Sequence, residues 1–147
     1  MLIDHDQIAA LIPHAGAMCL LDGVVHWDAT HIACTASSHR AADHPMRADG
    51  QLGTACAIEY AAQAMAVHGA LSLHPGQRPR AGLLVGVRDL RLAAATLDAI
   101  AGDLAIEAEQ LSAGSSGVMY RFAVHGDGLV LASGRATVIL DIDGAPS

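Results

Sequence analysis

The chain has 147 residues, 52% hydrophobic and 16% charged, a composition that excludes a disordered protein and allows a single domain, 1–147, with a sizeable core. Its net charge is −7 and its eight basic residues are all arginines without a basic run, which argues against a nucleic acid partner. The cysteines are odd in number and scattered in apolar segments, so we expect buried free thiols at Cys19, Cys34 and Cys56.

A short helix and a hairpin are predicted at the start of the chain. Asp4 is a suitable cap for a helix that continues to Leu11 and ends before Pro13. Aliphatic residues fill 18–27, and the alternation over 31–38 predicts a partner strand. Residues 1–10 carry acidic residues where an export signal needs positive charge, so we expect a cytoplasmic location.

Residues 38–51 form an irregular polar segment directly before the most apolar stretch of the chain. Loops that lead into a buried helix are common places for functional sites. His39 and His44 are the histidines of this segment, with Asp43 beside them. We expect no metal, because no second cluster completes a set of four ligands.

Residues 50–77 are predicted to contain one long helix that is apolar on nearly all sides. Small apolar residues recur every three or four positions, so we expect the helix to be buried. Gly53 and Thr54 can begin the helix, and Gly69 or the segment 72–75 can end it. A membrane span is not expected, because polar residues interrupt the run and alanine favours membranes only weakly.

Glu59 is the only charged residue between positions 49 and 78. Burying an ionised carboxylate without a partner is costly, so Glu59 is either paired in the structure or retained for chemistry. Gln63 lies one helical turn later on the same face. The two side chains together indicate a site on the helix.

Four strands are predicted after the helix, at 83–92, 103–111, 117–125 and 129–139, separated by glycine-containing turns. A hairpin, one long helix and a run of antiparallel strands make an α+β arrangement with the sheet wrapped around the helix. This is the topology of the hotdog fold.

Three motifs resemble the 3-hydroxyacyl-acyl carrier protein dehydratases of bacterial fatty acid and polyene synthesis. Residues 12–14 with 20–22 are similar to the family's opening motif, L-P-H…L-L-x-D. Residues 59–64 are similar to its helix motif, E-A-x-A-Q-A. Residues 86–91 with 101–104 are similar to its strand and turn motif, G-x-x…P-G-D-x-L. The form Glu-Tyr-x-Ala-Gln-Ala resembles the dehydratase-like subgroup of aryl polyene gene clusters. Two segments depart from the family pattern: G-H-F-P is replaced by Asp43-His44-Pro45-Met46, and the P-G before the helix by Leu52-Gly53.

The resemblance implies dehydration of 3-hydroxyacyl thioesters on acyl carrier protein to trans-2-enoyl thioesters, without a cofactor. His44 is the candidate base for the C2 proton, and His39 and His14 are its rivals. Glu59, if buried and protonated, is the candidate acid for the C3 hydroxyl.

The remaining candidates are substrate-binding residues. Backbone N–H groups at Gly53 and Thr54, where the helix begins, would face the thioester oxygen. Gln63 would order water or the thioester region. His14 is assigned to substrate binding as the histidine of the opening motif.

The family resemblance also implies partners. Family members place the histidine and the acidic residue on opposite protomers, so we expect a homodimer or a heterodimer with a related hotdog subunit. Acyl carrier proteins are acidic, so docking on this acidic chain requires arginines, and the candidates are Arg78, Arg80, Arg88 and Arg91. Two alternatives stay open: a hotdog acyl thioesterase, and a non-catalytic acyl-binding subunit of a heteromeric dehydratase.

Overall fold

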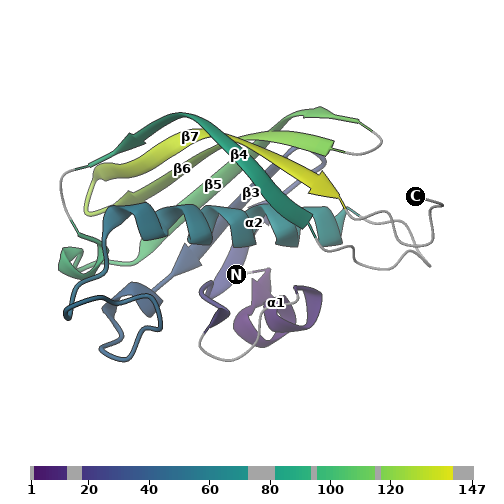
Figure 1. Ribbon diagram of the computed structural model, residues 1–147. Helices are drawn as coiled ribbons and strands as arrows, with labels where there is room; N and C mark the ends of the chain where they lie inside the picture. The colour runs from purple at the N-terminus through teal and green to yellow at the C-terminus, as the bar shows by residue number, and fades with distance from the viewer. Residues whose placement is uncertain (1, 13–17, 73–81, 94–95, 115–116, 141–147) are drawn as a thin grey trace.

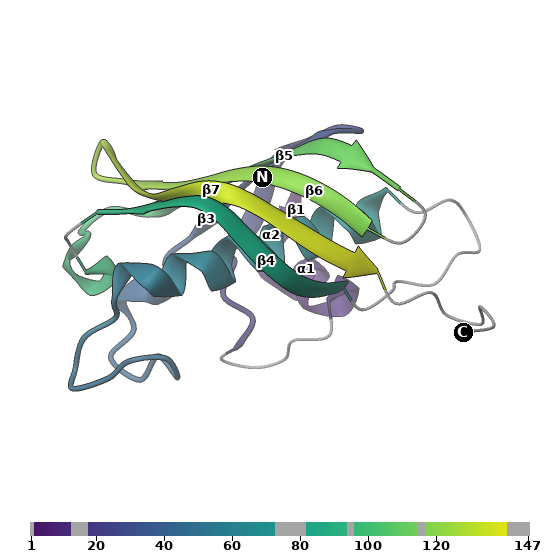
Figure 2. The same cartoon turned by 45° about the horizontal axis from the view of Figure 1, so that its top comes forward.

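The computed structural model describes residues 2–12, 18–72, 82–93, 96–114 and 117–140. Within these ranges one antiparallel sheet has the strand order β1-β2-β3-β5-β6-β7-β4. Its strands are β1 (Ile3–Asp4), β2 (Gly23–Trp27), β3 (His31–Ala36), β4 (Gly82–Leu92), β5 (Leu104–Ala113), β6 (Gly117–Gly126) and β7 (Leu129–Leu140). The sheet arches over the long helix α2 (Ala57–Leu71), and α1 (His5–Leu11) lies beside it (Figures 1 and 2). The predicted sheet around one long helix is confirmed.

The N-terminal helix α1 begins with the predicted cap. The Asp4 carboxylate accepts the Gln7 N–H, and the Gln7 side chain accepts the Asp4 N–H, both at 2.9 Å. This reciprocal pair satisfies two N–H groups that the first turn leaves unbonded. The two-residue strand β1, which pairs Ile3 with Val24, was not predicted. Pro13 lies outside the described residues.

The strands follow the predicted segments closely after the helix. Residues on β5 alternate, with Leu104, Ile106 and Ala108 buried toward α2 and Glu107 and Glu109 exposed on the outer face. Each buried leucine or isoleucine contributes about 1.5–3 kcal/mol to stability. The first hairpin strand was predicted to begin at residue 18 but begins at residue 23. Residues 18–20 are not paired in the sheet, because they bond to α2 instead.

Helix α2 packs against the concave face of the sheet through small residues. A 3-10 turn, η3 (Thr54–Cys56), leads into it, and the Ser72 N–H closes it on the His68 carbonyl at 3.0 Å. Gly69 was a candidate end but lies inside the helix. Three of the chain's few aromatic residues are buried in the core, Tyr60 on the helix and Tyr120 and Phe122 on β6.

The expected burial of α2 holds for only part of its surface in a single chain. One side of the helix, here called the open stripe, is half-buried at Ile58, Glu59, Ala62, Ala66 and Ala70 and exposed at Ala55 and Gly69. Apart from Glu59 the open stripe is apolar, so its exposure to water is unfavourable in an isolated chain. No helix in the described part of the chain is long and apolar enough to cross a membrane.

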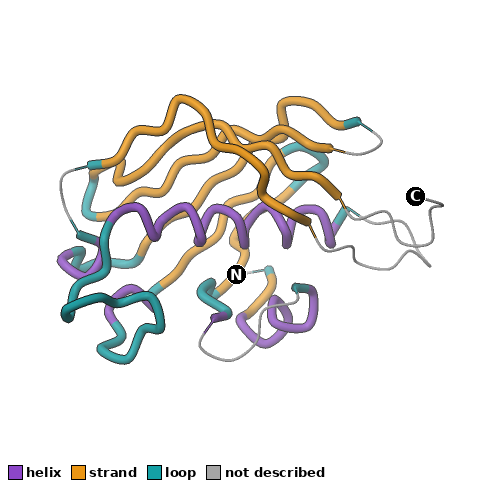
Figure 3. Tube along the Cα trace, in the orientation of Figure 1, coloured by secondary structure: helices purple, strands orange, loops and turns teal. Residues whose placement is uncertain are grey.

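Arg47 organises the polar loop that leads to α2, which Figure 3 shows around the beginning of that helix. Its guanidinium donates to the carbonyls of Ala41 at 2.8 Å, Gly50 at 2.7 Å and His39 at 3.3 Å. Asp98 lies 4.0 Å from Arg47 and accepts the Leu52 N–H at 2.7 Å, and this N–H lowers the pKa of the Asp98 carboxyl. These contacts tie separate parts of the loop together and join the loop to Asp98 where it meets α2.

Candidate functional site

His44 is held inside this loop by both ring nitrogens. Its side chain is 5% exposed. Nδ1 accepts the Met46 N–H at 3.1 Å, and Nε2 lies 3.1 Å from the hydroxyl of Tyr60 on α2. Burial, with a smaller effect of the Arg47 charge, lowers the pKa of His44. The imidazole is therefore neutral near pH 7, the state that a general base requires.

The contact with Tyr60 continues as a chain of hydrogen bonds. The Tyr60 hydroxyl lies 2.8 Å from Ser38 Oγ, and Ser38 donates to the Leu20 carbonyl at 2.9 Å. Tyr60 is fully buried, and burial raises its pKa to about 12, so the phenol stays protonated. Sequence reasoning missed Tyr60 and Ser38 as part of the site. The signal for Tyr60 was its place in the helix motif, directly after Glu59.

Glu59 lies on the open stripe of α2, one residue before Tyr60. It is half-buried in the single chain, so the burial expected for a protonated acid is only partial here. Within the described ranges, no hydrogen bond or ion pair reaches its carboxylate. His44 and Glu59 are thus brought to the same end of α2 but approach neighbouring sides of the helix.

Gln63 turns inward instead of standing beside Glu59. It is 1% exposed, its Oε1 accepts the Leu20 N–H at 2.8 Å, and its Nε2 donates to the Met18 carbonyl. An amide can donate and accept at once, which suits it to joining α2 to an irregular backbone segment. Gln63 therefore fixes residues 18–20, the same segment that receives the Ser38 hydrogen bond.

The other candidates occupy different positions around the helix start. Gly53 forms an isolated bridge with Thr96, and the Thr54 hydroxyl donates to the Ala93 carbonyl at 3.1 Å. His14 lies outside the described residues. Arg88 and Arg91 are exposed on the edge strand β4, whereas Arg78 and Arg80 are outside the described ranges.

His39, the rival of His44 in the same loop, is fully buried. Its Nε2 donates to the Ile100 carbonyl at 3.0 Å, and burial lowers its pKa. Its Nδ1 has no hydrogen-bond partner in the described structure. The bond to Ile100 ties the loop to the segment after η4 (Leu97–Ala99), so the contacts of His39 are those of a packing residue.

The cysteines are free thiols that differ in burial. Cys19 and Cys34 are buried as predicted, but Cys56 is half-buried, at the end of η3 directly before α2 and near the open stripe. Burial raises the pKa of Cys34 to about 12, which leaves it unreactive near neutral pH. Among the described residues, no three histidine, cysteine or acidic side chains gather as metal ligands.

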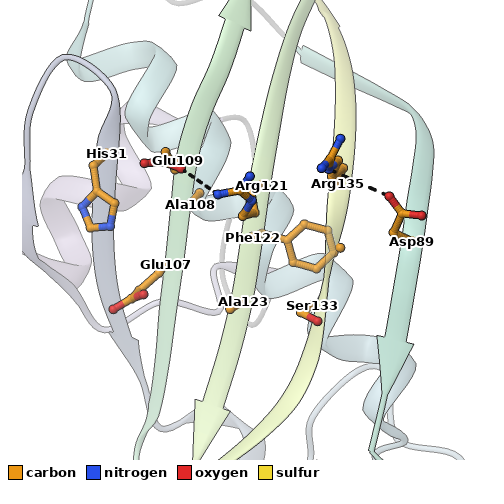
Figure 4. A pocket seen from close by; sticks show the side chains of 11 residues that line it. His31, Asp89, Glu107, Ala108, Glu109, Arg121, Phe122, Ala123, Ser133 and Arg135 are labelled. Carbon is orange, nitrogen blue, oxygen red and sulfur yellow. Dashed lines mark hydrogen bonds and ion pairs between the residues drawn. The ribbon is translucent and has the colours of Figure 1, made fainter.

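A separate hollow of about 430 Å³ lies on the outer face of the sheet (Figure 4). Arg121 pairs with Glu109 at 3.3 Å and Arg135 pairs with Asp89 at 3.9 Å along its floor. None of the candidate residues at the start of α2 lines this hollow. The sheet separates it from the helix, so it is not part of the same site.

An antiparallel sheet around one long helix, with polar side chains gathered where that helix begins, defines a hotdog-fold protein. The family model for ApeP dehydratase, ApeP-like, matches residues 6–143. The chain belongs to the ApeP-like dehydratase family.

Solved structures share this fold at low sequence identity. The dehydratase heterocomplex ApeI:P from Xenorhabdus doucetiae is 22% identical, with 92% of this chain and 91% of that chain covered and a TM-score of 0.74. A mutant thioesterase from Pseudomonas aeruginosa is 15% identical, with 95% of both chains covered and a TM-score of 0.66. A thioesterase from Haemophilus influenzae is 14% identical, with coverages of 96% and 95% and a TM-score of 0.65. No curated protein sequence matches the chain.

Proposed function

We propose that this protein dehydrates 3-hydroxyacyl thioesters on acyl carrier protein to trans-2-enoyl thioesters, in fatty acid or polyene synthesis. Membership of a dehydratase family supports the reaction class. The observation that carries the proposal is the placement of a neutral histidine, His44, against the residue that follows Glu59 on α2. A base and an acid at one end of a helix are what this elimination requires.

The proposed chemistry moves two protons. His44 takes the C2 proton, the electron pair of that bond forms the C2=C3 double bond, and the C3–O bond breaks. Glu59 donates its proton to the departing hydroxyl, which leaves as water. In the state described, the Met46 N–H occupies His44 Nδ1, so residues 45–47 must release this nitrogen before it accepts a proton.

The residues around the helix start have proposed roles in binding. Backbone N–H groups of Gly53 and Thr54 stabilise the negative charge that develops on the thioester oxygen. Gln63 acts by fixing residues 18–20 beside the substrate. His14, in the neighbouring segment of the opening motif, contacts the substrate.

A partner subunit is proposed to cover the open stripe of α2. The stripe is apolar apart from Glu59 and remains uncovered in a single chain, and a related hotdog subunit on it would complete the burial of that carboxyl. The partner is a second copy or a related chain, and the similarity to a structure described as a dehydratase heterocomplex supports the related chain. We also propose a cytoplasmic location. The carrier is proposed to dock on Arg88 and Arg91, the exposed arginines of β4, together with Arg78 and Arg80.

The test is incubation of the purified protein with a 3-hydroxyacyl thioester on a carrier protein, followed by intact mass measurement. Dehydration lowers the mass of the loaded carrier by one water. Release of the free hydroxy acid would instead identify a thioesterase, the activity of two structures with this fold. An unchanged carrier, both with the protein alone and with its co-purifying subunit, would favour a non-catalytic acyl-binding role.

A further inference from the structure

The hydrogen bonds around Tyr60 have only one possible direction. Ser38 has a single hydroxyl hydrogen and donates it to the Leu20 carbonyl, so Ser38 must accept from Tyr60. Tyr60 likewise has one hydrogen, so it must accept from His44 Nε2. At the other end, the Met46 N–H can only donate, which makes Nδ1 of His44 an acceptor.

An obligate donor and an obligate acceptor therefore fix the whole series. The Met46 N–H stands at one end and the Leu20 carbonyl at the other, and only a neutral imidazole with its proton on Nε2 satisfies every bond between them. A proton on Nδ1 would face the Met46 N–H, with two donors opposed. The tautomer of His44 follows from the direction of these bonds.

A second tyrosine–histidine pair in the same core has the opposite direction. His68 Nε2 donates to the Asp28 carbonyl at 2.9 Å, so its Nδ1, 2.7 Å from the Tyr120 hydroxyl, accepts from that hydroxyl. Both tyrosines are buried, and both pairs join α2 to another segment: Tyr60 on the helix meets His44 of the loop, and His68 on the helix meets Tyr120 of β6. Tyr120 thus donates to its histidine, whereas Tyr60 accepts from its own.

We infer that Tyr60 is a positioning residue that holds the proton of His44 on Nε2. Nδ1 of His44 is then the nitrogen that accepts the substrate proton. This inference rests on the proposed function. When Nδ1 becomes protonated, Nε2–H becomes a charged donor, and its hydrogen bond to Tyr60 strengthens. The hydroxyl of Tyr60 is a better acceptor because it donates in turn to Ser38. Tyr60 therefore stabilises the imidazolium that forms during proton transfer, without touching the substrate.

The test compares Tyr60→Phe with Tyr120→Phe in the full chain and combines turnover with nitrogen NMR of the histidine rings. We expect Tyr60→Phe to lower kcat by about 10–100-fold, with KM within about threefold, because the lost interaction strengthens only during proton transfer. Tyr120→Phe should keep kcat within about threefold. Equal losses of kcat in the two variants would overturn the inference.

The NMR measurement is independent of turnover. In the wild type, the ring of His44, assigned by its loss in His44→Ala, should carry its proton on Nε2, in a hydrogen bond that protects it from exchange. Tyr60→Phe should lose that protection, whereas in Tyr120→Phe the Nε2 proton of His68 should remain, because Asp28 still accepts it. A proton on Nδ1 of His44 in the wild type would overturn the inference.

Two results separate this inference from the proposed function. If Tyr60→Phe does not fold, the inference is tested by the wild-type tautomer and by Ser38→Ala, which removes the acceptor of the Tyr60 hydroxyl. We expect Ser38→Ala to lower kcat several-fold. An unchanged kcat in Ser38→Ala would contradict the inference. If the protein produces no enoyl thioester, the proposed function fails although the tautomer is as expected. If it produces enoyl thioester with the His44 proton on Nδ1, only the role of Tyr60 fails.

Discussion

Tyr60 and Tyr120 show how the bonding partners of a buried residue decide what it does. Burial raises the pKa of both phenols to about 12, so each keeps its proton and must satisfy it inside the protein. The direction of each hydrogen bond then depends on the neighbouring backbone groups. Sequence motifs named His44 and Glu59 but not Ser38, because the contacts of Ser38 join segments that meet only in the folded chain.

The first prediction concerns the proposed acid. Glu59→Gln keeps the shape of the side chain and removes its proton donor, so we expect turnover to fall by about 10²–10⁴-fold. Thermal unfolding should change little, because Glu59 is half-buried on the open stripe. Turnover within about tenfold of the wild type would remove Glu59 from the mechanism.

The second prediction separates the two histidines of the loop. His44→Ala should lower kcat by about 10²-fold or more, whereas His39→Ala should mainly lower stability, because His39 is fully buried and bonded to Ile100. The measurement is kcat per folded molecule, with the folded fraction taken from unfolding curves. A dead His39→Ala beside an active His44→Ala would assign the base to His39.

At the scale of elements, local pattern predicted most of the fold. Alternation and glycine turns located the strands after α2 to within about two residues, and in β5 and β6 the alternation reflects one buried face and one more exposed face. The strand order was not encoded locally: β4 follows the helix in the chain but pairs with β7 at the edge. Periodicity also overstated the burial of α2 in the single chain. An apolar stripe has the same sequence pattern whether it packs against its own chain or against a partner.

The third prediction uses two glycines in these elements. A Cβ on Gly126, at the end of β6, would lie 2.7 Å from Ile100 Cγ2, so Gly126→Ala should destabilise the protein by about 1–3 kcal/mol. A Cβ on Gly69 meets nothing within 4 Å in the single chain, so Gly69→Ala should stabilise α2 by about 0.5–1 kcal/mol. Thermal unfolding of both variants checks this, and a stabilised Gly126→Ala would contradict the packing described at β6.

At the scale of the whole molecule, buried histidines make stability depend on pH. His39, His44 and His68 are buried, and burial lowers the pKa of each below the ordinary value of 6.5. The unfolded chain therefore binds protons at a higher pH than the folded chain does. Stability from these groups is complete above about pH 6.5 and is lost as the pH falls toward the lowered values.

The fourth prediction follows from this sign. The thermal midpoint should be nearly constant between about pH 8 and pH 7 and should fall steeply from about pH 6.5 to pH 5. His68→Gln removes one titrating group and can still bond to Asp28 and Tyr120, so the fall should be shallower in this variant. A midpoint that stays level or rises on acidification would show that the buried histidines do not control it.

The most direct test of the central claim, acid–base dehydration at the start of α2, is the mass of the carrier-bound acyl group after incubation in D₂O. We expect wild-type protein to convert the 3-hydroxyacyl carrier to the enoyl form, lighter by one water, and to place deuterium at C2 of the hydroxyacyl thioester that remains. Both changes should be absent with His44→Ala. Release of free hydroxy acid without an enoyl product, or equal deuterium incorporation by His44→Ala, would contradict the account.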